Sequence, residues 1–190
     1  MDHGDHVGLL RDALEPGGTW ADVGAGTGAF TLALADLLGP GGRIVAVDRD
    51  GAALRHNEQT VASRFPGVHM RTLVADFSRP LELPALDGMV AANSLHYVPT
   101  DQQALVVAAL AAHLRPGGRF VVVEYDVDHG NPWVPYPFSY SSWGRLAAAA
   151  GLEATVRLGR VPSRFLGAIY SAVSRRASAD PNRSSSSASS

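Results

Sequence analysis

The feature of this sequence that most constrains its fold is an alternation of short apolar runs with segments of helical periodicity. Apolar runs of the length of buried strands cover residues 19–23, 43–48, 68–74, 88–92 and 119–124. Between the first three runs, residues 29–38 and 51–65 space their apolar side chains as one face of a helix does. Alternating strands and helices predict a parallel β-sheet that is covered by helices on both faces.

The end of the chain departs from this alternation. Helical periodicity over residues 142–150 stops at Gly151, and two strand-like segments, 153–158 and 165–173, follow with no helix between them. Strands that are joined without a helical crossover pair in antiparallel fashion. We therefore expect an α/β fold with a doubly wound, Rossmann-like mixed sheet of about seven strands, whose last strand is antiparallel.

One further helix is predicted in the middle of the chain. Thr100 and Gln103 have the spacing of a capping box, in which each side chain bonds the other residue's backbone N–H at a helix start. This pattern predicts a helix over residues 100–114, and Pro116-Gly117-Gly118 then turns the chain into the most apolar strand.

The sequence near the two ends of the chain predicts one domain, with only a short N-terminal helix to cover the functional site. Residues 1–173 form the expected domain, whereas the serine-rich residues 174–190 cannot bury apolar surface and predict a disordered tail. Before the first strand, residues 5–14 contain one short helical pattern. We therefore expect a functional site that is open on this side or closed by another chain.

Composition excludes several kinds of chemistry. The chain has no cysteine, which excludes disulfides, thiol catalysis and cysteine zinc sites, and all 16 of its Lys+Arg residues are arginine. Lysine-dependent sites, such as a Walker phosphate loop, a Schiff base or a Tyr/Lys catalytic pair, are excluded as well. The net charge of −2 gives no basic excess for a nucleic acid or an anionic membrane. With neither a signal pattern nor a membrane-length apolar run, we expect a cytoplasmic protein.

The residues that follow each strand carry the functional information, because open sheets bind ligands outside the carboxyl ends of their strands. The first strand runs into Asp22-Val23-Gly24-Ala25-Gly26-Thr27-Gly28, a glycine-rich turn that opens directly into a helix. Gly24, Gly26 and Ala29 even satisfy the spacing of a dinucleotide-binding loop.

Carboxylates follow the other strands. They are Asp48, Asp76, Glu124, Asp126 and Asp128. Such an acidic rim disfavours a pyrophosphate and favours a sulfonium, an ammonium and ribose hydroxyls, which carboxylates bind through charge-assisted hydrogen bonds. The alternative is that each acid is a helix cap or a turn former.

Six motifs in order resemble the class I S-adenosylmethionine-dependent methyltransferase family, closest to its ubiquinone/menaquinone-biosynthesis type. They are the glycine-rich turn, Asp48, Asp76-Phe77, residues 86–90 followed by Asn93, residues 114–118 and the final hairpin. The resemblance implies that S-adenosylmethionine is the cofactor and a small molecule the methyl acceptor. It assigns the methionine part to Asp22, Gly24, Ala25, Gly26 and Asn93, the ribose to Asp48, and the adenine to Asp76 and Phe77, with Arg49 stacked nearby or solvated.

The acceptor side is less determined. His96 follows the fourth strand and is the candidate general base, because its ordinary pKa is about 6.5; the alternative is a positioning residue. Tyr97 is expected to shape the same wall or to belong to the core. Trp133 and Tyr136 lie in the proline-rich segment 130–138, which predicts an acceptor-pocket wall or an aromatic plug at the sheet edge.

Other functions stay open at the level of sequence. An NAD(P)-linked oxidoreductase would use the same glycine-rich turn, although the chain lacks the usual Tyr/Lys pair. A non-catalytic module that binds the cofactor is the third possibility. His3 and His6 are three residues apart, but a flexible polar end is the favoured interpretation, so we expect no metal.

Overall fold

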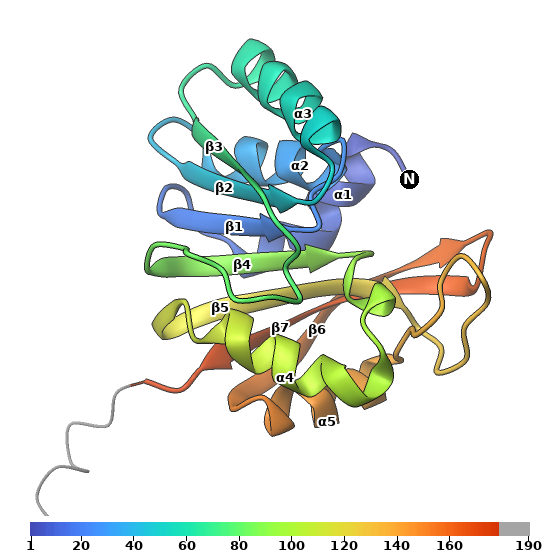
Figure 1. The fold of residues 1–190 in the computed structure, drawn as a ribbon. Helices are drawn as coiled ribbons and strands as arrows, with labels where there is room; N and C mark the ends of the chain where they lie inside the picture. Colours follow the sequence, from blue (N-terminus) through green and yellow to red (C-terminus); the bar gives the residue numbers. More distant parts are fainter. Residues whose placement is uncertain (179–190) are drawn as a thin grey trace, which may run out of the picture.

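A computed structural model describes residues 1–178 and shows a seven-stranded mixed sheet with helices on both faces (Figure 1). The strands are β1 (Thr19–Val23), β2 (Arg43–Asp48), β3 (His69–Val74), β4 (Leu86–Ala92), β5 (Leu114–Tyr125), β6 (Leu152–Ser163) and β7 (Gly167–Arg176). The α-helices are α1 (His3–Leu10), α2 (Ala29–Leu38), α3 (Gly51–Arg64), α4 (Thr100–Ala111) and α5 (Tyr140–Ala149). Two short 3-10 helices, η1 (Arg11–Ala13) and η2 (Leu95–Tyr97), complete the described elements.

The topology confirms the predicted fold class. The strand order is β3-β2-β1-β4-β5-β7-β6, in which the first five strands of the chain are parallel. Strand β7 runs antiparallel to both β5 and β6. The chain returns from the β3 edge to the centre through β4, so the loops after β1 and β4 meet at the point where the strand order reverses.

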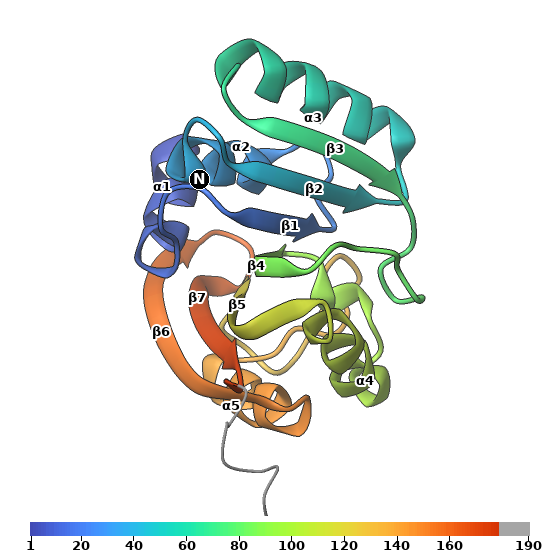
Figure 2. The same cartoon turned by 90° about the vertical axis from the view of Figure 1, so that its left-hand side faces the viewer.

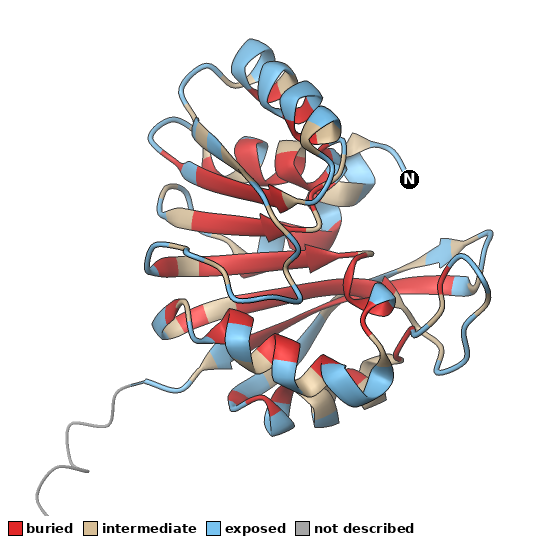
Figure 3. Cartoon of the chain, viewed as in Figure 1, coloured by how far each residue is buried: buried red, intermediate tan, exposed pale blue. Residues whose placement is uncertain are grey.

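Two apolar cores lie on opposite faces of the sheet, because successive side chains of a strand point to opposite sides. On β5, Phe120 and Val122 pack with α4 and α5, whereas Val121 and Val123 pack with α1 and α2. Figure 2 shows these two helical layers from the side, and Figure 3 shows that burial concentrates in the central strands. No helix within residues 1–178 is long and apolar enough to cross a membrane.

The start and end of the middle helix differ from the prediction. The capping box is wrong, because Pro99 occupies the N-cap position and Thr100 is already the first helical residue. The Gln103 side chain is buried and instead donates hydrogen bonds to the backbone carbonyls of Val98 and Tyr136. The helix ends at Ala111, since Leu114 already pairs with β4 in the sheet.

The tail boundary is also corrected. The sequence placed the start of a disordered tail at Ser174, yet Ser174 is fully buried and paired with Phe120 of β5. Strand β7 continues to Arg176 because β5 pairs with it as far as Arg175 and β6 as far as Arg176. The remainder of the predicted tail, residues 179–190, lies outside the described residues.

Candidate functional site

Two adjoining cavities lie at the carboxyl edge of the sheet. The larger encloses about 330 Å³ and the smaller about 260 Å³, and Gly24 and Asn93 line both of them. The larger cavity also gathers Asp48, Arg49, Asp76, Phe77 and Tyr97. The smaller cavity gathers Asp22, Ala25 and Gly26. The fold thus brings all nine predicted cofactor-binding residues to two connected spaces.

The carboxylates of the larger cavity are held by backbone groups on one side and remain open on the other. Asp48 accepts the Gly26 N–H at Oδ2 (2.8 Å) and the Asp50 N–H at Oδ1 (2.9 Å). Asp76 uses only Oδ1 for the N–H and the hydroxyl of Ser78, and these bonds hold the pKa of Asp76 below its usual range. Both carboxylates are therefore fixed in orientation and keep acceptor capacity for a ligand.

The glycine at position 24 is required by space as well as by conformation. Its φ is 78°, which favours glycine, and a Cβ there would lie 2.4 Å from the Cβ of Ser94. Ser94 is buried and donates its hydroxyl to the Val23 carbonyl (2.8 Å), so it cannot easily move. Sequence reasoning missed Ser94, although its place directly after Asn93 was available as a signal.

A buried hydrogen-bond chain supports the smaller cavity. Asn57 of α3 donates to the Thr31 hydroxyl (2.7 Å), which in turn donates to Asp22 Oδ2 (2.6 Å). All three side chains are buried, and desolvation raises the pKa of Asp22 to about 7. Sequence reasoning missed Thr31 and Asn57, yet Asn57 sits among the core-facing positions of α3 between Leu54 and Val61.

Asn93 lies between the two cavities in a conformation that few residues other than glycine adopt. Its φ is 49°, and its buried Oδ1 has no hydrogen-bond partner among the described residues. An unpaired buried carbonyl oxygen costs free energy, and a donor from a bound ligand would satisfy it. This orphaned acceptor marks the wall shared by the cavities as a place for an N–H-bearing ligand.

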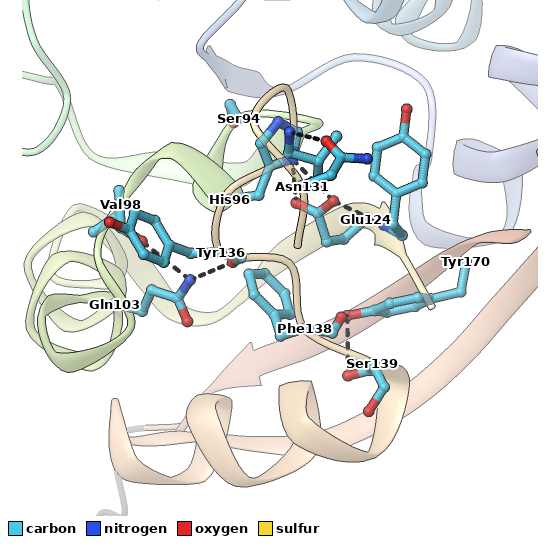
Figure 4. Close-up of polar contacts among 12 residues, drawn as sticks. Ser94, His96, Val98, Gln103, Glu124, Asn131, Tyr136, Phe138, Ser139 and Tyr170 are labelled. Carbon is cyan, nitrogen blue, oxygen red and sulfur yellow. Dashed lines mark hydrogen bonds and ion pairs between the residues drawn. The ribbon is translucent and has the colours of Figure 1, made fainter. Parts of the chain in front are cut away.

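His96 is held by a hydrogen bond to a buried carboxylate. Its Nδ1 lies 2.9 and 3.0 Å from the two carboxylate oxygens of Glu124, and both residues are buried (Figure 4). Its ring packs against the ring of Tyr97, with centroids 4.4 Å apart. Tyr97 lines the larger cavity, whereas His96 is not among the residues that line either cavity.

The aromatic segment after β5 divides into two parts. Phe138 is buried against Trp143 of α5, as the plug interpretation expects. Trp133 is 77% exposed, and neither it nor Tyr136 lines the two cavities. The Tyr136 N–H donates to the His96 carbonyl (3.0 Å), which ties the segment to η2 beside the site.

Two acids of the predicted rim serve the fold instead of the cavities. Asp126 accepts the Tyr140 N–H and pairs with Arg160, while Asp128 accepts the N–H and the hydroxyl of Ser139 at the start of α5. These bonds are helix-capping and turn contacts, so the alternative interpretation holds for both residues. Of the acids after the strands, Asp48 and Asp76 face the larger cavity.

Comparison with known proteins agrees with this geometry. The model of the Methyltransferase domain family matches residues 21–118, just over half of the chain. A ubiquinone/menaquinone biosynthesis C-methyltransferase of Ectopseudomonas mendocina is 27% identical over 133 residues, which are 67% of this chain and 51% of that protein. A probable cobalt-precorrin-6B C(15)-methyltransferase (decarboxylating) of Thermoplasma volcanium is 25% identical over 116 residues, 61% of this chain and 55% of that protein. The chain therefore spans about half the length of these curated relatives.

A solved structure shares the whole fold. The 1,6-didemethyltoxoflavin-N1-methyltransferase of Burkholderia thailandensis, with bound 1,6-didemethyltoxoflavin and S-adenosylhomocysteine, superposes with a TM-score of 0.74 at 24% identity. The match covers 93% of this chain and 78% of that one. The family match decides against the oxidoreductase reading of the glycine-rich turn. This chain belongs to the methyltransferase domain family, and its motif order and fold resemble those of class I S-adenosylmethionine-dependent methyltransferases.

Proposed function

We propose that this protein transfers the methyl group of S-adenosylmethionine to a small-molecule acceptor. The observation that carries the proposal is the pair of adjoining cavities, which meet at Gly24 and at the orphaned oxygen of Asn93. One cavity offers carboxylates beside an aromatic ring, and the other offers a carboxylate beside a glycine-rich turn. The two match a nucleoside and an amino acid joined through one sulfur atom.

In this proposal the larger cavity holds the adenosine. The open lone pairs of Asp48 accept the ribose hydroxyls, and Asp76 Oδ2 accepts the adenine amino group. Phe77 bounds the base through its ring and its backbone N–H, and Arg49 lies at the exposed rim. Each carboxylate is already oriented by backbone donors, so little ordering is needed when the ligand binds.

The smaller cavity holds the methionine part. Asp22 and Asn93 provide acceptors for its ammonium group, and the backbone of Gly24, Ala25 and Gly26 lies along its length. When bound, S-adenosylmethionine supplies both the methyl group and its leaving group. The residues of this chain then have to position the acceptor in line and exclude water.

For the acceptor side we propose Tyr97, with Trp133 and Tyr136 further out, as the apolar wall. The acceptor is proposed to be a small molecule rather than a nucleic acid, since the net charge is −2. The expected cytoplasmic location stays a prediction.

His96 stays the candidate base, and its geometry sets a condition on that role. Glu124 holds Nδ1, so Nε2 is the atom available for a proton. His96 lines neither cavity, whereas the Tyr97 ring packed against it lines the larger one, so proton transfer requires a movement that exposes Nε2 to the cavity. If His96 is the base, His96→Ala lowers kcat far more than cofactor affinity; equal losses of both would identify a positioning residue.

Calorimetric titration with S-adenosylmethionine, S-adenosylhomocysteine and NAD in parallel tests the proposal. We expect micromolar binding of the first two ligands and its loss in Asp48→Ala. Asp12→Ala, which changes an exposed acid outside both cavities, serves as the matched control. Binding of NAD alone would contradict the proposal. Turnover in a subsequent acceptor screen would discard the non-catalytic alternative.

A further inference from the structure

One residue that lines the smaller cavity comes from the N-terminal helix. His6 of α1 lines this cavity together with Asp22, Gly26 and Phe30. Its ring packs against the ring of Phe30 at the start of α2, with centroids 4.7 Å apart. A residue that the sequence placed in a flexible polar end is therefore part of the wall of the proposed cofactor site.

The segment that carries His6 is ordered by its own contacts. Asp2 caps α1 by accepting the Asp5 N–H (3.0 Å), and Asp5 accepts the Asp2 N–H in return (2.9 Å). Val7 and Leu10 on the same helix are buried in the core beneath α2. Helix α1 is thus fixed on the domain, and the place of the His6 ring is fixed with it.

The ring nitrogens of His6 have no hydrogen-bond partner among the described residues. Its ring makes no hydrogen bond with any residue of 1–178, whereas His3 on the same helix pairs with Asp36 at 3.0 Å. Burial is the main cause that lowers the pKa of His6, so near neutral pH the ring is uncharged and offers one N–H donor.

The charge pattern of the cavity suits both ends of an amino acid. Asp22 and Asn93 supply acceptors, as an ammonium group requires. The same cavity is also lined by His6 and the first turn of α2, where the N-cap residue Gly28 has no side chain to satisfy the free N–H groups. A cavity lined by both donors and acceptors matches a ligand that carries a carboxylate and an ammonium.

We propose that His6 donates a hydrogen bond to the carboxylate of the cofactor's methionine moiety and that α1 thereby covers this end of the site. The inference rests on the proposed function, because it assumes that S-adenosylmethionine occupies the two cavities. It adds a binding residue from an element outside the glycine-rich turn. It also gives the short N-terminal helix a role in holding the cofactor.

Decarboxylated S-adenosylmethionine isolates this contact, since it lacks the carboxylate and keeps the sulfonium and the ammonium. We expect His6→Ala to weaken binding of S-adenosylmethionine by about tenfold to a hundredfold, the range for a hydrogen bond to a charged group. Binding of the decarboxylated ligand should change less than about twofold. His6→Gln, which keeps an N–H donor, should recover part of the loss, and His3→Ala should bind both ligands as the wild type does.

Equal losses for both ligands in His6→Ala would overturn the inference, because they would show that the ring acts by packing against Phe30. Unchanged affinity for S-adenosylmethionine in that variant would overturn it as well. Circular dichroism confirms that α1 is retained, and His6→Gln provides the readout if the alanine variant loses it. Failure of the wild type to bind S-adenosylmethionine would instead overturn the proposed function and this inference with it.

Discussion

We predict that the Asp22 carboxylate lowers the stability of the cofactor-free protein and strengthens binding of the cofactor. Both effects can be measured directly. Desolvation raises the pKa of its buried carboxyl from 3.8 to about 7, against the opposing effect of the Thr31 hydroxyl. This difference corresponds to roughly 4 kcal/mol of destabilisation of the ionised form in the cofactor-free protein. The Asp22→Asn variant keeps an oxygen for Thr31 and removes the charge. We therefore expect it to be more stable than the wild type above neutral pH.

The sign follows from linkage between protonation and folding. Between about pH 4 and pH 7 the folded protein keeps the Asp22 proton that the unfolded chain has released, so this residue makes the free energy of unfolding fall as pH rises. Above the folded pKa the effect is complete and no longer changes. The advantage of Asp22→Asn should thus be near zero at about pH 4 and approach its maximum of roughly 4 kcal/mol at about pH 8.

Thermal unfolding in the absence of cofactor reads out this difference. For a domain of this size the full effect raises the midpoint of Asp22→Asn by roughly 10 °C over the wild type at about pH 8. The same variant should bind S-adenosylmethionine more weakly, because it offers no charge to the ammonium. A stability difference that is the same at pH 4 and pH 8 would refute the reasoning, since it would show that folding does not raise the pKa of Asp22.

Three further perturbations follow from the geometry. Gly24→Ala places a Cβ 2.4 Å from Ser94 at a φ of 78°. We therefore expect the free energy of unfolding in urea titrations to fall by about 1–3 kcal/mol and cofactor binding to weaken. Normal cofactor binding would contradict the close approach. His96→Ala leaves the buried Glu124 carboxylate with only the Tyr125 N–H as a partner and should lower the free energy of unfolding by about 3–5 kcal/mol in the same assay. A change below 1 kcal/mol would show that water reaches the carboxylate. Tyr170→Phe removes a buried hydroxyl that donates to a backbone carbonyl (3.2 Å) and should cost about 0.5–1.5 kcal/mol at unchanged cofactor affinity; altered affinity would link this bond to the site.

Local pattern was sufficient for several of the elements and for the expectation of where the candidate site lies. The bounds of β1, α2 and β2 agree with those predicted, because apolar periodicity is set by neighbouring residues in the chain. Asp48, Asp76 and Asn93 were found for a related reason. Each lies at the end of a parallel strand or within two residues of it, and such strands end at one edge of the sheet.

The local sequence pattern gave a wrong prediction where a residue interacts with a partner that is distant in the chain. Gln103 has the spacing of a capping box, but its amide bonds the Tyr136 carbonyl of a segment that the chain reaches only after β5. Ser174 resembles the polar tail that follows it, yet the pairing of β7 with β5 buries it. In both cases a tertiary contact outweighs a weak local preference.

The sequence by itself determined the fold class, the family and the residues around the glycine-rich turn, since these depend on periodicity and on motifs within single loops. The tertiary structure alone decided that Asn57 supports Asp22 through Thr31, that Glu124 holds His96 and that His6 lines the smaller cavity. Those partners are brought together by packing between elements far apart in the chain. The pattern within one stretch of residues does not indicate which residues of other elements will lie next to it in the fold.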